Sequence, residues 1–200
     1  GDSPQTIEVA DSRVADILLP NHVEAAASGE EEVEKALDSP IGSAKLEELA
    51  RGRHRVVIIT SDITRPMPSR QVLPAVLGRL YRAGVKREEI TIVFALGSHR
   101  RHTEEEKKKL AGEEIYREIR CLDSGAFDFI RMGTTSHGTP VDIMREVAEA
   151  DFRICLGNIE FHYFAGFSGG SKAIMPGVST FEAIQANHRF MVREEAAAGR

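Results

Sequence analysis

The hydrophobic residues change their spacing along this chain, and the changes predict an alternation of strands and helices. Residues 55–60 and 88–97 contain continuous runs of apolar, mostly β-branched side chains, which are typical of strands buried on both faces. Residues 68–84 instead carry apolar side chains three and four positions apart and end at a glycine, which predicts an amphipathic helix. Thr103 begins a second, highly charged helix, and Glu106 three residues later completes a capping box.

The pattern is less regular towards the two ends of the chain. Residues 1–27 alternate apolar and polar side chains, and we expect short strands there. Residues 29–51 have the spacing and acidic first turns of two short helices, with a break at residues 39–42. After the charged helix comes a less certain stretch, followed by segments at 127–133 and 140–150, a strand at 151–157 and, after a glycine-rich loop, a helical run at 179–195.

Repetition of strand, polar loop and helix predicts βαβ crossovers in a single domain. The expected fold is an α/β three-layer sandwich, with a mostly parallel sheet flanked by helices on both faces. Ligands of such sheets bind at the carboxyl ends of the strands. The polar loops that directly follow buried strands are therefore the places where functional side chains are expected.

Composition narrows the class of protein. The 200 residues are 42% hydrophobic and 28% charged, which excludes a disordered chain or a disulfide scaffold. The net charge of −5 argues against nucleic-acid binding, and no apolar run approaches the roughly 18 residues that span a membrane. Cys121 and Cys155 are expected to be reduced packing thiols, and the first residues lack the features of a secretory signal, so a cytoplasmic location is predicted.

The loop at residues 61–68 follows the first buried strand and carries Asp62 and Arg65. A guanidinium is suited to bidentate contact with a carboxylate or phosphate, and the N-terminus of the following helix favours the same anion. Alternatively, Asp62 and Arg65 pair with each other and only cap the turn. The residue types leave both interpretations open.

The loop at residues 97–103 follows the next strand and carries two histidines. His99, beside a glycine at the strand end, has the properties of a general base near neutral pH. His102, next to the helix start, is interpreted as an exposed histidine without a function.

The glycine-rich segment 157–177 contains His162 and Lys172. It is not a Walker A loop, because serine precedes Lys172 and alanine follows it where a magnesium-binding hydroxyl is required. Lys172 precedes apolar residues, and desolvation there would favour the neutral, nucleophilic amine. The helix-breaking pair Pro176–Gly177 allows the following helix to fold back, so that His188 can face this loop.

Three stretches together resemble one family, the nickel-pincer-nucleotide-dependent lactate racemases and related 2-hydroxyacid racemases and epimerases. They are SDITRPMP, ALGSHRRHTEEE and GNIEFHYFAGFSGGSKAIMPGVSTFEAIQANH. The resemblance implies an enzyme of two α/β domains with the active site between them, and residues 1–200 as the amino-terminal, cofactor-carrying domain. It also implies racemisation or epimerisation of a 2-hydroxyacid, by hydride abstraction and return through a lysine-tethered nickel-pincer nucleotide.

The same resemblance assigns roles to individual residues. His99 and His162 match the two catalytic histidines, and His188 matches the protein ligand of nickel. The cofactor-binding residues that it implies are Asp62, Ile63, Thr64, Arg65 and Lys172, the last through a thioamide link. The implied partners are a small 2-hydroxyacid substrate and the enzymes that make the cofactor.

Family enzymes are expected to be about twice this length, so the isolated domain is expected to be inactive.

Two other functions fit parts of the pattern. Asp62, His99 and His162 are possible zinc ligands of a hydrolase, which leaves Lys172 without a role. The glycine-rich loop and Arg65 also fit a non-catalytic module that binds a nucleotide or another anion.

Overall fold

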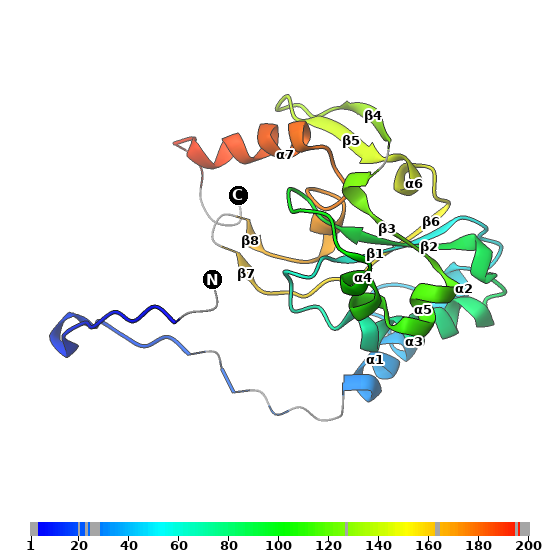
Figure 1. Cartoon of the computed structure of the whole chain (residues 1–200), viewed down its shortest axis with the longest axis horizontal. Helices are drawn as coiled ribbons and strands as arrows, with labels where there is room; N and C mark the ends of the chain where they lie inside the picture. The colour runs from blue at the N-terminus through cyan, green and yellow to red at the C-terminus, as the bar shows by residue number, and fades with distance from the viewer. Residues whose placement is uncertain are drawn as a thin grey trace.

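Four parallel strands form the central sheet of the computed structural model (Figure 1). They are β1 (Val56–Ser61), β2 (Ile90–Ala95), β3 (Arg120–Asp123) and β6 (Phe152–Cys155), in the spatial order β3–β2–β1–β6. The structure describes residues 4–19, 21, 22, 24, 29–126, 128–162, 165–194 and 196. The apolar runs of the sequence thus become strands, and the predicted α/β fold with a parallel sheet is confirmed.

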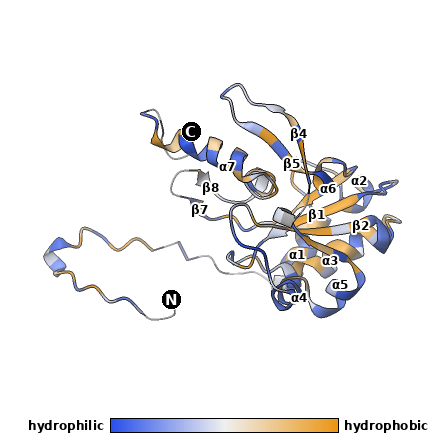
Figure 2. Ribbon diagram, turned by 45° about the horizontal axis from the view of Figure 1, so that its top comes forward, coloured by the Kyte–Doolittle hydropathy of each residue, from blue (hydrophilic) through white to orange (hydrophobic). Residues whose placement is uncertain are grey.

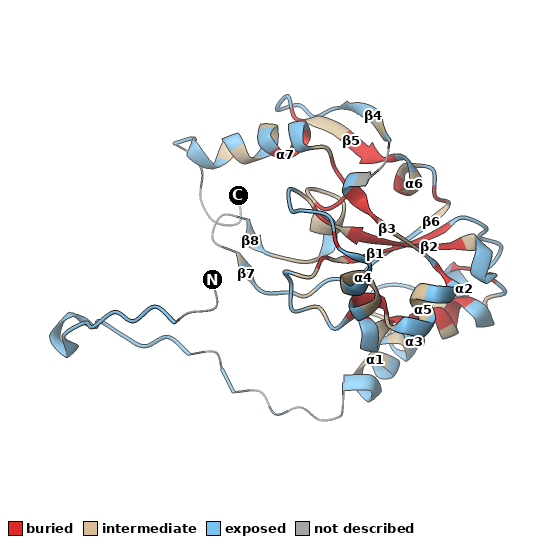
Figure 3. Cartoon of the chain, viewed as in Figure 1, coloured by how far each residue is buried: buried red, intermediate tan, exposed pale blue. Residues whose placement is uncertain are grey.

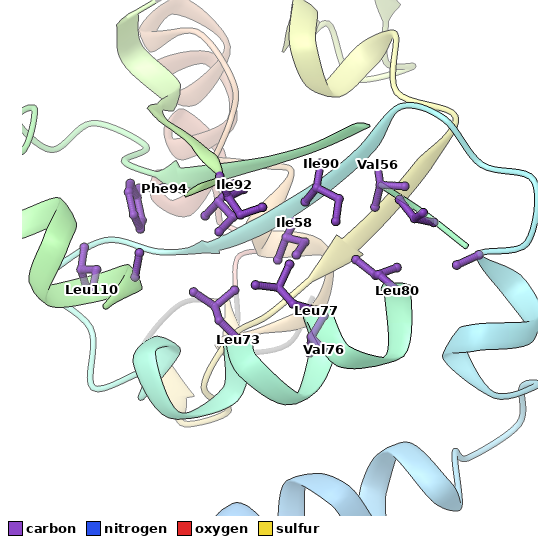
Figure 4. Packing of buried hydrophobic residues seen from close by; sticks show 14 residues of the cluster. Val56, Ile58, Leu73, Val76, Leu77, Leu80, Ile90, Ile92, Phe94 and Leu110 are labelled. Carbon is purple, nitrogen blue, oxygen red and sulfur yellow. The ribbon is translucent and has the colours of Figure 1, made fainter. Parts of the chain in front are cut away.

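Helices cover the first face of the sheet, and those at residues 29–38, 69–82 and 104–111 begin and end close to the predicted positions, whereas the helix at 113–118 is not among the predicted ones. The helices are α1 (Gly29–Asp38), α2 (Leu46–Leu49), α3 (Ser69–Arg82), α4 (Glu104–Ala111) and α5 (Glu113–Glu118). Alternate residues of β1 and β2, among them Ile58 and Ile92, face α3 and meet Leu73 and Leu80 (Figure 4). All four of these side chains are completely buried. The apolar residues that alternate along the strands and those at helical spacing in α3 thus pack into one core.

The second face is covered by shorter elements. They are the antiparallel hairpin β4 (Phe129–Thr134) and β5 (Pro140–Met144), α6 (Arg145–Ala148), the 3₁₀ turn η4 (Gly170–Ala173) and α7 (Phe181–His188). Val57 and Ile59 of β1 pack there against Met144, Val147 and Val178. Figure 2 shows apolar residues concentrated in the central strands, and Figure 3 shows that the same strands are the buried part of the molecule. The sheet therefore has a core on each face.

The strand order determines where a ligand can bind. The chain runs from β1 outward through β2 to β3, and then returns to place β6 on the other side of β1. The connection after β1 leads to α3 on the first face, whereas the connection after β6 leads to η4 and α7 on the second face. The carboxyl ends of these two strands therefore border a crevice. The remaining short elements are the 3₁₀ turns η1 (Asp11–Arg13), η2 (Arg87–Glu89), η3 (Ser124–Ala126) and η5 (Arg189–Val192), and the two-residue strands β7 (Phe161–His162) and β8 (Gly166–Phe167).

Buried Arg79 of α3 ties the two amino-terminal helices to the sheet. Its guanidinium donates to Glu34 and Asp38 of α1 at 2.5 and 2.7 Å, and to Glu47 of α2 at 3.2 Å. Three carboxylates from two helices converge on one cation, and this raises the pKa of Arg79 further above its ordinary value. Acidic residues of segment 29–51 therefore help to hold these two helices against α3.

The structure corrects the expectation for the start of the chain. Within residues 4–19 there is no strand, only the 3₁₀ turn η1, and these residues are exposed (Figures 1 and 3). Alternation of apolar and polar residues produces a strand only where a neighbouring strand supplies hydrogen bonds, and the described part of this segment has none. The helix predicted at 179–195 is also shorter, because α7 ends at His188 and continues as a 3₁₀ turn.

The start of the charged helix is as predicted, whereas the expectation of two packing thiols is wrong for Cys155. The capping box at Thr103 forms, with the amide of Glu106 donating to the threonine hydroxyl at 3.2 Å. Cys121 and Cys155 are free thiols, although Cys155 is exposed, and burial raises the pKa of Cys121 to about 12. Among the described residues, no helix is long and apolar enough to cross a membrane.

Candidate active site

A cleft of about 680 Å³ opens at the carboxyl ends of the strands, beside β1, β2 and β6. Its walls come from the three polar segments singled out in the sequence and from the end of α7. The predicted site residues that line it are Asp62, Arg65, His99, His162, Lys172 and His188. Side chains that lie up to 126 residues apart in the chain, from Asp62 to His188, are thus brought to one cavity by the strand order.

His99 and Asp62 form a hydrogen-bonded pair on one wall of the cleft. The Nδ1 atom of His99 lies 2.8 Å from Oδ2 of Asp62, and the hydroxyl of Thr64 donates to Oδ1 of the same carboxylate at 2.9 Å. Asp62 is 3% exposed, whereas His99 is 40% exposed. A buried carboxylate that accepts from Nδ1 orients the ring and leaves Nε2 as the nitrogen that can take a proton from a ligand.

His102 is a correction to the sequence-based interpretation, which made it an exposed histidine without a function. Its side chain is 1% exposed and lies 2.6 Å from the equally buried carboxylate of Asp123, measured from Nδ1 to Oδ1. Its Nε2 accepts a hydrogen bond of 3.1 Å from the backbone amide of Ile63. A position beside a helix start suggested solvent exposure, but β3 places Asp123 directly behind the ring.

The segment that carries Lys172 is held at the end of β2 by hydrogen bonds to its own backbone. Gly169 and Gly170 have positive φ angles, which lets the chain turn sharply into η4 and Lys172. The carbonyl of Gly177 then accepts from the amide of Gly97 at 3.0 Å and from the hydroxyl of Ser124 at 2.9 Å. These two contacts fix the segment on the carboxyl-terminal side of Lys172.

Gly177→Ala is expected to disturb this attachment. A methyl group at Gly177 would collide with the backbone carbonyl of Ala173 and with the side chain of Ala95, neither of which can rotate away. We expect the free energy of unfolding to fall by about 1–3 kcal/mol, measured by urea denaturation. The control is Gly78→Ala in α3, where the nearest atom is 3.8 Å away and a gain of about 0.4–1 kcal/mol is expected. Equal stability of the two variants would contradict the close approach.

Positive groups dominate the far side of the cleft. Burial lowers the pKa of Lys172 below its ordinary value, the nearby Arg65 lowers it further, and Glu160 opposes both. The pKa of His162 is also lowered, mainly by desolvation and then by the charges of Lys172 and Arg65. Both shifts favour the neutral forms, in which the amine is a nucleophile and the imidazole is a base.

His162 and His188 reach the cleft from separate elements. His162 ends β7, and the amide of Ala165 donates to its Nδ1 at 3.3 Å. His188 ends α7, whose first turn is held by Thr180; this hydroxyl accepts from the amide of Ala183 and donates to Asp142 of β5 at 2.9 Å. The hairpin β4–β5 thus sets the direction of the helix that carries His188.

Two residues of the predicted cofactor-binding loop do not line the cleft. Ile63 packs against the core under α3, and Thr64 contacts the carboxylate of Asp62. In the described part of the chain, Asp62 and Arg65 form no ion pair with each other. The carboxylate of Asp62 binds His99 instead, which argues against the alternative in which Asp62 and Arg65 only cap the turn. The sequence-based reasoning overlooked Asp123 and Ser124, which only the approach of β3 to the site makes relevant.

The zinc alternative finds no support in the arrangement of ligands. Across the described residues, no three side chains of His, Cys, Asp or Glu come together as a group that could hold a metal ion. Asp62 and His99 are hydrogen-bonded to each other, whereas His162 lies on a separate element, β7. A metal in this cleft would need further donor atoms from a ligand.

Comparisons with known proteins agree on one family. The model described as the lactate racemase N-terminal domain matches residues 1–199. The chain is 44% identical over 164 residues to a lactate racemase of Lactiplantibacillus plantarum, covering 80% of this chain and 38% of that protein. It is 37% identical over 193 residues to a lactate racemase of Thermoanaerobacterium thermosaccharolyticum, covering 94% and 45%.

Solved structures give the same picture. The lactate racemase apoprotein from Thermoanaerobacterium thermosaccharolyticum superposes with a TM-score of 0.75 at 37% identity, over 85% of this chain and 42% of that one. A Thermotoga maritima protein superposes with a TM-score of 0.64 at 22% identity, over 86% and 43%, which shows a shared fold alone. The chain spans less than half the length of the curated relatives that it matches.

Proposed function

Because the chain belongs to the lactate racemase family, through that family's N-terminal domain, we propose that it is the cofactor-carrying domain of a 2-hydroxyacid racemase or epimerase. The observation that carries this proposal is the convergence of two histidines, a lysine with a lowered pKa and an arginine on one cleft. The racemase names of the two relatives suggest a lactate-like substrate.

The cleft suits the nickel-pincer nucleotide that the resemblance implies. Its volume of about 680 Å³ falls within the range of about 300–1,000 Å³ that is usual for small-molecule sites. Arg65 and Lys172 favour an anionic nucleotide, and the lowered pKa of Lys172 favours the amine form needed for a covalent link. His188 would supply an imidazole nitrogen, a ligand type that suits nickel. When bound, the cofactor would supply a reversible acceptor for the hydride of the substrate's Cα.

His99 is proposed as the base for one orientation of the substrate hydroxyl. Asp62 accepts the hydrogen bond from Nδ1, so the neutral ring keeps its proton there and has an unprotonated Nε2. That nitrogen takes the hydroxyl proton as the Cα–H bond breaks, and Asp62 stabilises the imidazolium that results.

His162 is proposed as the matching acid and base on the other side. The amide of Ala165 donates to Nδ1, so the neutral ring carries its proton on Nε2. His162 can therefore give a proton to the substrate oxygen only when its ring is the imidazolium, and the loss of that proton returns it to the neutral form, which balances the proton taken up by His99. Inversion of a 2-hydroxyacid turns its hydroxyl towards the opposite wall, so each direction of the reaction uses the two histidines in exchanged roles.

Arg65 is proposed to hold the substrate carboxylate. It stands beside Lys172 and His162 closely enough to lower the pKa of both, and within the described residues no ion pair with an acidic side chain neutralises it. A guanidinium can bind a carboxylate through two parallel hydrogen bonds, which fixes the orientation of Cα between the two histidines.

A racemisation assay tests this function. A longer enzyme, in which this domain is joined to the second half that the relatives have, is produced together with the cofactor-maturation enzymes and given single stereoisomers of lactate, malate and a sugar acid. Polarimetry follows the racemisation of lactate or malate, or the epimerisation of the sugar acid. We expect one of these acids to be racemised or epimerised, and no activity from residues 1–200 alone. Failure with all three, combined with nucleotide binding that ignores His99→Ala and His162→Ala, would favour the non-catalytic binding module instead.

A further inference from the structure

We infer that His102 is a positioning residue which, held by Asp123, fixes the loop that presents Asp62 and Arg65 to the cleft. The inference rests on the proposed function, because it is that function which gives Asp62 and Arg65 a role. His102 itself does not line the cleft. It acts through the backbone of its neighbour in space, Ile63.

The first step is the attachment of the His102 ring. Oδ1 of Asp123 lies 2.6 Å from Nδ1 of His102, and Oδ2 accepts from the backbone amide of His102 at 3.0 Å. The ammonium of Lys107 lies 3.7 Å from Oδ2. With both side chains at most 2% exposed, the carboxylate holds the ring and its backbone together, out of contact with water.

The second step is the protonation state of the ring. A backbone amide can only donate, so Nε2 of His102 must be unprotonated where it accepts from the amide of Ile63 at 3.1 Å. The neutral ring then carries its proton on Nδ1, directed at Asp123. Asp123 therefore selects the tautomer in which Nε2 can bind the loop, in the way that second partners fix the orientation of catalytic and metal-bound histidines.

The third step is the consequence for the cleft. Ile63 lies between Asp62, which orients His99, and Thr64, whose hydroxyl donates to Asp62. Besides the Asp62–His99 contact, the Ile63 amide is thus a second point where the loop after β1 is tied to the loop after β2, and through Asp123 it is also tied to the end of β3. The His102 ring also packs edge-on against Phe94, with 5.5 Å between the ring centres. This packing does not require the hydrogen bond from the Ile63 amide.

Amide exchange in His102→Phe tests the inference without any activity. Phenylalanine keeps the ring against Phe94 but removes both nitrogens. We expect the Ile63 amide to exchange about tenfold faster or more, measured by NMR on the 200-residue chain. His102→Gln, which restores an acceptor, should recover part of the protection. The matched control is His54→Phe, which breaks another histidine–carboxylate pair, with Glu89, before β1 begins.

A second variant guards against misfolding of the first. Asp123→Asn keeps the size of the side chain and removes its charge, and a smaller acceleration at Ile63 is expected. In the wild-type chain, ¹⁵N spectra should show His102 with its proton on Nδ1. Exchange at Ile63 that is no faster in either variant than in His54→Phe, or a proton found on Nε2, would overturn the inference.

Kinetics of the longer, cofactor-loaded enzyme provide the functional readout. We expect His102→Phe to lower kcat by about 10–100-fold, with partial recovery in His102→Gln and no change in His54→Phe. A faster amide exchange together with an unchanged kcat would overturn the positioning role. A wild-type enzyme that racemises nothing would instead refute the proposed function, while the exchange data would still decide whether His102 holds the loop.

Discussion

His99→Ala is expected to lower kcat/KM of the longer enzyme by about 10²–10⁴-fold, the usual contribution of a positioned general base. The structure gives the reason: His99 is 40% exposed on the cleft wall, and its Nδ1 is held at 2.8 Å by an aspartate that is 3% exposed. Alanine removes the proton acceptor that Asp62 orients on that wall. The measurement is the initial rate of racemisation, taken separately from each enantiomer.

Two further variants make this expectation specific. Asp62→Asn keeps the shape of the partner but loses the charge that stabilises the imidazolium, so a substantial loss is expected there as well. His54→Ala removes a 73% exposed histidine outside the cleft and should leave the rate unchanged. A His99→Ala enzyme with near wild-type rates in both directions would exclude His99 as a base.

Lys172→Arg is expected to abolish covalent cofactor loading completely. Arginine keeps the positive charge but has no accessible neutral form, whereas burial and Arg65 already lower the pKa of Lys172. The protein is produced together with the maturation enzymes, and peptide mass spectrometry locates any added mass. We expect an adduct on Lys172 in the wild type and none in the variant.

His188→Ala and Lys109→Arg complete this experiment. His188→Ala should keep the adduct on Lys172 and lose nickel, measured by elemental analysis. Lys109 is exposed on α4, and its change to arginine should alter neither quantity. An unmodified Lys172 in the wild-type chain after production with the maturation enzymes would mean that this chain has the fold without the cofactor chemistry.

Local pattern was sufficient for much of the fold. Continuous apolar runs identified β1 and β2, which are buried on both faces, whereas segment 151–157 contains β6, an edge strand whose residues alternate between partly buried and exposed. The helical spacing of residues 68–84 identified α3, and the capping box at Thr103 identified the start of α4. Polar loops after buried strands also pointed to the candidate site, since parallel strands place such loops along one edge.

Local pattern was insufficient where a structure depends on partners distant in sequence. Residues 4–19 alternate as a strand does, yet they form no strand, because within the described chain no second strand lies beside them. The second face of the sheet is covered by the hairpin β4–β5 and short helices, whose place depends on contacts with β1 and Val178.

The sequence by itself determined which side chains are available: a lysine after glycines, two histidines in loops, a carboxylate and an arginine after β1. Only the tertiary structure decided which of them work together. His99 pairs with Asp62 across 37 positions of the chain, and His102 pairs with Asp123 across 21. Two histidines three positions apart thus both pair with a buried carboxylate, but the ring of His99 is 40% exposed on the cleft wall and the ring of His102 is 1% exposed. The physical reason is that spacing along the chain fixes a side chain's own conformation, whereas its burial, tautomer and pKa depend on what the other strands bring next to it.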